Sequence, residues 1–260
     1  MGVDTIISTV TGNAQLKLID GAVTCRVRRF VPAEFEGQPS LRSQNGLLDR
    51  GRAAALALLQ HYRGYIQSTV FVCGMFYERF SVNGMVSHRI GVNTGYGNEG
   101  DYIADPRNMT AVAPVYDSSQ NLSTLCLTSV YDVARFVVRS LEMASWPQEM
   151  TMCGELMTVQ TLIDTIQLCR GMFRSFFLVS NNTNVFAGRQ FYNVEWQNPA
   201  GLQYHLTMAQ IAGDTPKQRR FATLIETAEN RYSYASPAYL NSLFADITPM
   251  TFRNWFLSKA

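Results

Sequence analysis

Short β-branched runs alternate with segments of helical periodicity in the first part of the chain. Residues 4–10 (Asp-Thr-Ile-Ile-Ser-Thr-Val) read as a short strand that ends before Gly12, and residues 29–31 read as a buried strand that stops at Pro32. Between them, apolar residues at helical spacing over 14–25 predict a helix. Strand, helix and strand within about 30 residues form a βαβ unit, which predicts parallel strands covered by helices.

The same alternation continues after the second strand. Residues 47–62, rich in alanine and leucine, predict a helix, and residues 68–73 predict a buried strand that ends at Gly74. Residues 76–114 are glycine-rich and irregular. We therefore expect an α/β fold whose later elements are a strand over 123–128, an amphipathic helix over 130–144, a helix capped by Thr158 that runs to about residue 170, and helices near 206–212 and 217–228.

Composition narrows the class of protein. At 260 residues and 47% hydrophobic content the chain can bury a large core. Its net charge is +2, and no basic stripe interleaved with aromatic residues is present, which argues against nucleic acid as a partner. The densest basic cluster, Arg26, Arg28 and Arg29, is expected to be the solvated end of a helix.

Targeting and cysteine patterns favour a cytoplasmic protein with no membrane partner. The N-terminus has no basic segment followed by an apolar run, and no stretch of 18 apolar residues occurs. The five cysteines are scattered, without a CxxC pair or a nearby histidine, which indicates reduced thiols and no metal site.

Two familiar dehydrogenase motifs do not fit. Residues 95–100 match GxGxxG literally, but a phosphate-binding loop needs a strand before it and a helix after it, and Pro106 follows here. We expect a surface or lid loop instead. The chain has three lysines, Lys17, Lys217 and Lys259, and none lies four residues after a tyrosine, so the Tyr-x-x-x-Lys pair of ordinary short-chain reductases is absent.

The residues that open the chain nevertheless resemble a known family. Residues 2–10, then 14–16 and then 29–35 (Arg-Phe-Val-Pro-Ala-Glu-Phe) are similar to the middle of isoflavone-reductase-like, or NmrA-like, proteins, which are atypical short-chain dehydrogenases/reductases. In that family the segment is the fourth strand, the next helix and the fifth strand of a dinucleotide-binding domain. The similarity runs to the C-terminus, but the family's first three strands, with their glycine-rich loop, have no counterpart in this sequence.

The resemblance implies a shortened Rossmann-like parallel sheet with flanking helices and a smaller C-terminal substrate-binding part. The corresponding domains are a truncated NAD(P)-binding domain over residues 1–148 and a substrate-binding part over 149–260, which interleave. A sheet that begins at Thr5 leaves an edge strand, so we expect residues 1–10 to pair with a second copy in a homodimer, to be covered by a rearranged segment, or to await a further N-terminal part.

The resemblance also implies catalytic residues. The family places a lysine near the start of the helix that follows the proline-glutamate loop, and Arg52 is the best match here. Arginine stays protonated, so Arg52 would anchor an anionic or carbonyl oxygen, or else pair with Asp49 or Glu34. Glu34 and Glu36 are candidates for acid–base work, with exposed loop carboxylates as the alternative.

The remaining site residues also follow from the resemblance. Positions that would flank the nicotinamide end of NADP are Thr9, Val10, Gly12, Pro32 and Ala33, and substrate-binding candidates are Cys73, Gly74, Met75 and Phe76. The resemblance implies NADP as the cofactor. The alternative is no cofactor, because the phosphate loop, which has no counterpart in this sequence, is the main source of dinucleotide affinity.

Three functions remain open from the sequence. The first is NAD(P)H-dependent reduction of a small molecule of the secondary-metabolite type. The second is a cofactor-independent isomerase, cyclase or dehydratase that reuses the substrate cavity. The third is a non-catalytic, NmrA-like binding or regulatory protein.

Overall fold

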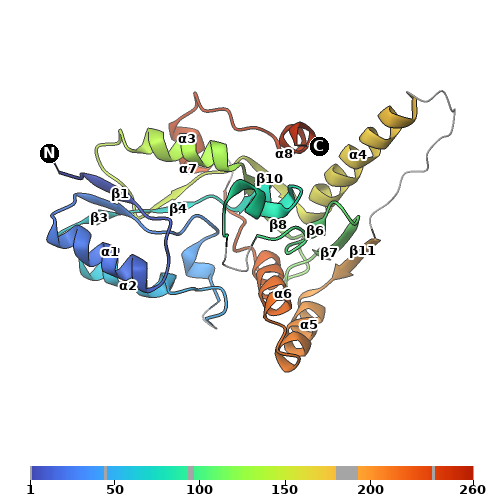
Figure 1. Cartoon of the computed structure of the whole chain (residues 1–260), viewed down its shortest axis with the longest axis horizontal. Helices are drawn as coiled ribbons and strands as arrows, with labels where there is room; N and C mark the ends of the chain where they lie inside the picture. The colour runs from blue at the N-terminus through green and yellow to red at the C-terminus, as the bar shows by residue number, and fades with distance from the viewer. Residues whose placement is uncertain (1, 44–45, 93–96, 180–192, 236–237, 260) are drawn as a thin grey trace.

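The computed structural model describes residues 2–43, 46–92, 97–179, 193–235 and 238–259 (Figure 1). Strands and helices alternate through most of the chain, as the sequence predicts for an α/β fold. In chain order the elements are β1 (Thr5–Ile7), α1 (Asn13–Thr24), β2 (Arg29–Val31), the 3-10 turn η1 (Pro39–Leu41), α2 (Arg52–His61), β3 (Gln67–Ser68), β4 (Val70–Val72), β5 (Met75–Phe76), η2 (Tyr77–Phe80), η3 (Gly84–His88), β6 (Ala104–Asp105), β7 (Thr110–Pro114), β8 (Thr124–Thr128), α3 (Val130–Ser140), β9 (Glu149–Thr151), β10 (Glu155–Thr158), α4 (Val159–Val179), β11 (Asn193–Gln197), α5 (Pro199–Ile211), α6 (Thr215–Ala228), α7 (Tyr239–Leu243) and α8 (Phe252–Ser258).

The N-terminal strands are parallel, which confirms the βαβ prediction. β1 pairs with β2, and β2 pairs with β3. The strand predicted over 68–73 is interrupted at Thr69: β3 lies before the break and pairs with β2, while β4 lies after it and pairs with β9. Both halves of the interrupted strand therefore pair in parallel, β3 with β2 on one side and β4 with β9 on the other.

Helices cover both faces of these strands (Figure 1). On one face α1 and α2 enclose a core that includes Ile19, Phe30 and Leu59. On the other face α3 and α7 pack over Phe71 and contribute Phe136 and Leu240 to a second core. Burial on both faces explains why every residue of β2 and β4 is buried and why these strands, Arg29 apart, are apolar and do not alternate with polar residues.

The remaining strands, from β5 onward, are arranged differently. β8 pairs in parallel with β5 and antiparallel with β10, and β7 pairs in parallel with β11 and antiparallel with β6. Their core joins these strands to α4, α5, α6 and α8 and includes Leu127, Ile163 and Trp255. β9, β10 and β11, from residues 149–260, pair with β4, β8 and β7, from residues 1–148, so strands of the two predicted parts interleave. The division into 1–148 and 149–260 stays a prediction.

Arg29 corrects one expectation from the basic cluster. Its guanidinium is buried and donates to the backbone carbonyls of Leu141, Met143 and Ala144 at 2.7–3.1 Å. It also lies 4.7 Å from the ring centroid of Trp146. Arg29 therefore fixes the end of α3 against β2 and is not a solvated cation, because three carbonyls replace the water that burial removes.

β1 is an edge strand, with β2 on its one paired side. Val3, Ile7 and Val10 in and around it are 63%, 38% and 44% exposed. An edge that offers both apolar side chains and backbone hydrogen-bonding groups favours pairing with another strand, so the predicted homodimer remains a prediction. Within the described residues, no helix is both long and apolar enough to cross a bilayer.

Glu78 is a buried carboxylate at the junction of the two parts. It is 0% exposed, and its Oε2 accepts a hydrogen bond of 3.1 Å from the backbone N–H of Val130 at the start of α3. Burial raises the pKa of Glu78 to about 7, because the charged form loses its hydration. The protonated form is therefore the one that the fold favours.

The Glu78 carboxyl predicts a specific pH dependence of stability. Because its folded pKa is raised, the free energy of unfolding should be greatest below about pH 4.5 as far as this group contributes, and should fall by about 3 kcal/mol as the pH rises to about 7. Glu78→Gln keeps an acceptor for Val130 and removes the titration. Urea unfolding from pH 5 to 8 should show the variant gaining stability relative to the wild type as pH rises; parallel curves would contradict the assignment.

Candidate functional site

A cavity of about 590 Å³ lies at the carboxyl ends of the N-terminal parallel strands. Such ends are where open α/β sheets bind ligands, and the volume is in the range of about 300–1,000 Å³ that small-molecule sites occupy. Its walls come from the segments after β1, β2 and β4, the start of α2, the η2–η3 region and one face of α3. The lining residues are Thr9, Thr11, Ala33, Phe35, Glu36, Arg50, Arg52, Gly74, Met75, Phe76, Arg79, Met85, Arg89, Ile90, Gly91, Val92, Val130, Val133, Ala134 and Val137.

The structure brings together part of the site that the sequence predicts. Thr9, Ala33, Arg52, Gly74, Met75 and Phe76 line this cavity. Val10, Gly12, Pro32, Glu34 and Cys73 are not among its lining residues. Cys73 is fully buried, and Pro32 lines a separate cavity of about 430 Å³ beside α2. The cofactor and substrate roles of all these residues stay predictions.

Two groups of lining residues were missed from the sequence. The first is the α3 face formed by Val130, Val133, Ala134 and Val137. The amphipathic period of that segment was visible, but it could not show that part of the face borders a cavity. The second is a set of arginines, Arg50, Arg79 and Arg89, of which Arg79 and Arg89 stand in the irregular segment 76–114 and Arg50 stands in the segment 47–62 that predicts a helix. No sequence signal distinguishes these arginines from solvated ones.

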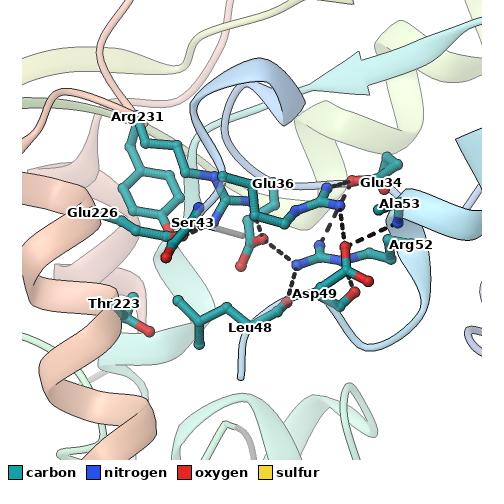
Figure 2. A network of polar contacts seen from close by, with 12 residues as sticks. Glu34, Glu36, Ser43, Leu48, Asp49, Arg52, Ala53, Thr223, Glu226 and Arg231 are labelled. Atoms are coloured by element: carbon teal, nitrogen blue, oxygen red, sulfur yellow. Dashed lines mark hydrogen bonds and ion pairs between the residues drawn. The ribbon is translucent and has the colours of Figure 1, made fainter. Parts of the chain in front are cut away.

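Among the described lining residues Glu36 is the single carboxylate, and two arginines hold it (Figure 2). Its Oε2 lies 2.8 Å from Arg52 Nη2 and 2.7 Å from Arg231 Nη2. Although burial opposes ionisation, these two guanidiniums, with Arg50 and Arg79 further away, hold the pKa of Glu36 well below its usual range. Glu36 is therefore a fixed anion, and the alternative of exposed loop carboxylates is wrong for both Glu36 and Glu34.

Glu34 lies behind the wall of the cavity. It is 1% exposed, forms an ion pair with Arg42, and its Oε2 lies 3.8 Å from Arg52 Nη1. Arg42 in turn pairs with Asp49 at 3.0 Å. Burial raises the pKa of Glu34, against the opposing effect of Arg52 and Arg42. This carboxylate contacts the outer side of the arginine that faces the cavity.

Arg52 is the first residue of α2 and is 2% exposed. Its Nη2 donates to the carbonyl of Leu48 at 2.7 Å and its Nε to the carbonyl of Asp49 at 3.1 Å. Together with Glu36 and Glu34, these contacts fix the guanidinium. The expected pairing with Glu34 is present, whereas the contact with Asp49 is to its backbone. The two glutamates raise the pKa of Arg52, so it remains a cation and cannot act as a base.

The turn before α2 depends on a glycine. Gly51 has φ +77°, and a Cβ there would lie 3.0 Å from the Cα of Gly12. The loop that follows β1 and the turn that precedes α2 thus approach each other closely, with Arg52 directly after the contact. This approach places Thr9 and Arg52 in one cavity wall.

The loop after β2 is also held by the C-terminal part. Arg231 is fully buried and pairs with Glu226 of α6 as well as with Glu36. Its carbonyl accepts a hydrogen bond from the N–H of Gln38 at 3.1 Å. A Cβ on Gly37 would lie 2.5 Å from the ring of Tyr232, so only glycine permits this approach. Residues far apart in the sequence therefore set the position of Glu36.

Two of the five positions predicted to flank a nicotinamide, Thr9 and Ala33, line the cavity. The GxGxxG match begins at residues outside the described ones, and the described part, from Gly97 to Gly100, leads into a turn and then β6. It therefore does not open a helix as a phosphate loop does. Among the described residues, no group of three or more His, Cys, Asp or Glu could hold a metal ion.

The chain is similar to known proteins in sequence and in fold. No family model matches the chain. A curated relative, "Oxidoreductase BOA1" of Botryotinia fuckeliana (strain B05.10), is 24% identical over 258 residues, which is 96% of this chain and 73% of that protein.

Solved reductases share the fold over nearly the whole chain. AtPrR2 with NADP+ and (+)pinoresinol has a TM-score of 0.68 at 13% identity, covering 99% of this chain and 76% of that one. The ternary complex of leucoanthocyanidin reductase from Vitis vinifera has a TM-score of 0.63 at 12% identity, covering 98% and 79%. Isoflavone reductase has a TM-score of 0.64 at 11% identity, covering 99% and 75%. The chain therefore has the Rossmann-like α/β fold of the isoflavone-reductase-like, NAD(P)-binding reductases, as its sequence resemblance predicts.

Proposed function

We propose that this protein is a small-molecule reductase of the isoflavone-reductase-like type, which takes hydride from NADPH. The observation that carries the proposal is the cavity at the carboxyl ends of the parallel strands, lined at once by Thr9, Ala33, Arg52 and Phe76. These residues come from four separate segments: the resemblance assigns Thr9 and Ala33 to the nicotinamide, Arg52 to the position of the family's lysine, and Phe76 to the substrate. The solved neighbours with NADP+ and (+)pinoresinol, or in complex with NADPH, support the same reading.

Apolar residues of the wall would give the cavity its shape, and Arg52 would supply its charge. Phe35, Met75 and Phe76 and the α3 face would hold an apolar substrate and keep water away from it. Bound NADPH would supply the hydride. Arg52, a fixed cation in the wall, would stabilise the oxygen on which negative charge develops. Glu34 would act by positioning Arg52 and not by proton transfer, because it does not line the cavity.

Proton delivery would come from water. Among the described lining residues there is no histidine, lysine, tyrosine or cysteine, and Glu36 is held ionised by its arginine partners. This feature also keeps the second candidate function in view: a binding or regulatory protein of the NmrA-like type would need the cavity but no proton donor. The isomerase, cyclase or dehydratase alternative gains no support from the oxidoreductase relative or the reductase structures.

Titration of the purified protein with NADPH and NADP+ tests the proposal directly. A dissociation constant in the micromolar range, on the order of 8 kcal/mol of binding, is expected for a working reductase. Nicotinamide fluorescence or calorimetry gives the value. If millimolar NADPH or NADP+ does not saturate the protein, the reductase proposal is contradicted, and a binding or regulatory protein remains as the proposed function.

Filling the cavity should block its ligand without unfolding the protein. Ala134 is an exposed residue of α3 that borders the cavity, so Ala134→Trp should reduce NADPH-dependent turnover, or substrate binding, at least tenfold. Val138→Trp is the matched control, because Val138 lies on the same helix, is 63% exposed and does not line the cavity. Equal effects of the two variants would show that the cavity is not the site.

Removal of Arg52 should be costly to stability as well. Arg52→Met leaves Glu36 and Glu34 without one of their buried cations, and breaking a buried ion pair from one side costs about 3–5 kcal/mol. Arg52→Lys keeps the charge but cannot reach both carboxylates and both carbonyls, so it should lose less. Urea denaturation measures both variants, with the exposed Arg107→Met as control. A loss below 1 kcal/mol in Arg52→Met would contradict the role of Arg52 in the network.

A further inference from the structure

We propose that the substrate of this cavity is an aromatic or polycyclic small molecule that carries a carboxylate, and that Arg89, with Arg50 and Arg79, binds that carboxylate. This inference rests on the proposed function, because it names the substrate class of the same site. It is carried by the charges of the lining residues together with the apolar surface opposite them.

The wall of the cavity carries more basic than acidic residues. Its described lining residues include four arginines, Arg50, Arg52, Arg79 and Arg89, and one carboxylate, that of Glu36. A low-dielectric cavity that gathers like charges in this way strengthens their field on whatever enters it. The excess of positive charge favours an anionic ligand.

The protein itself neutralises part of that charge. Glu36 is shared between Arg52 and Arg231, which lie 2.8 and 2.7 Å from the same oxygen. Asp101, which does not line the cavity, lies 3.4 Å from Arg79. In the part of the chain that the structure describes, no carboxylate lies within ion-pair distance of Arg89, whose side chain is exposed at the end of η3. The positive charge of Arg89 is thus available to a ligand.

The arginine donors differ in how the structure holds them. Arg79 is held in place, since its guanidinium also lies 5.4 Å from the ring centroid of Tyr102. Arg89 has φ +59°, which turns the chain back at the end of η3 so that Ile90 and Gly91 also border the cavity. The planar fork of an arginine matches the two oxygens of a carboxylate, a pairing that an ammonium group makes less specifically.

The remainder of the wall is apolar. Phe35, Phe76, Met85, Val133 and Val137 give the cavity an extended apolar surface. A small inorganic anion would leave this surface wet, and a neutral hydrocarbon would leave Arg89 without an anion to bind. A flat apolar body with one carboxylate satisfies both sets of side chains.

A matched pair of probes tests the inference. Naphthalene-2-carboxylate and naphthalene-2-carboxamide have the same ring and nearly the same size, and differ in charge at neutral pH. Calorimetry on the full chain should show the acid binding at least tenfold more tightly than the amide. Arg89→Gln should reduce this preference at least fivefold, whereas Arg107→Gln, an exposed arginine of the neighbouring segment that does not line the cavity, should leave it unchanged.

The outcomes separate this inference from the proposed function. Equal binding of acid and amide, or a preference that Arg89→Gln leaves intact, would overturn the carboxylate site. Competition between NADPH and the acid would also overturn it, because the arginines would then serve the cofactor. If NADPH fails to bind while the acid preference and its loss in Arg89→Gln persist, the carboxylate site stands and the reductase proposal alone is lost.

Discussion

The arrangement of the cavity depends on one half-buried carboxylate held between two buried arginines. Glu36 comes from the loop after β2, Arg52 from the start of α2, and Arg231 from the segment after α6 (Figure 2). Removing three charges from water costs several kcal/mol each unless they are paired, so none of the three can be buried in this way without the others. The loop after β2 can therefore adopt its position only when the C-terminal part is folded against it.

Because the three charges must be buried together, the main effect of the network is to specify one structure and not to add net stability. Buried ion pairs are often no more stabilising than apolar residues of the same volume, whereas a half-formed pair is strongly unfavourable. Arg231 can satisfy Glu36 and Glu226 together in only one relative placement of α6 and the loop. The close approach of Gly37 to the Tyr232 ring, which excludes any larger side chain, supports the same placement through van der Waals contact. We infer that the network selects one arrangement of the two parts.

The sequence predicts the parts of this protein that depend on local periodicity. The βαβ unit, the α3 helix and the cap at Thr158 all follow from patterns over a few turns, and the structure has them, with Thr158 Oγ1 accepting from the N–H of Thr161. Helix α2 begins at Arg52 and not at residue 47, because the turn before it serves the contact with Gly12. Burial of Arg29 and Glu34 could not be predicted, since their partners lie in other segments. Arg79 and Arg89 were missed for a different reason: an irregular segment gives no period that indicates which way a side chain points.

The exchange of the family's lysine for Arg52 limits the chemistry available to the cavity. A lysine can release a proton when it is desolvated, but Arg52 cannot, and Glu36 beside it is held ionised by its two arginine partners. The wall thus offers fixed charge and shape without a group that moves a proton near neutral pH. Reductions in which the acceptor's new anion is stabilised by conjugation or by its own electron-withdrawing groups need no acid at the moment of hydride transfer. Such acceptors, and not isolated ketones, are the ones that a cavity with an arginine in this position can serve.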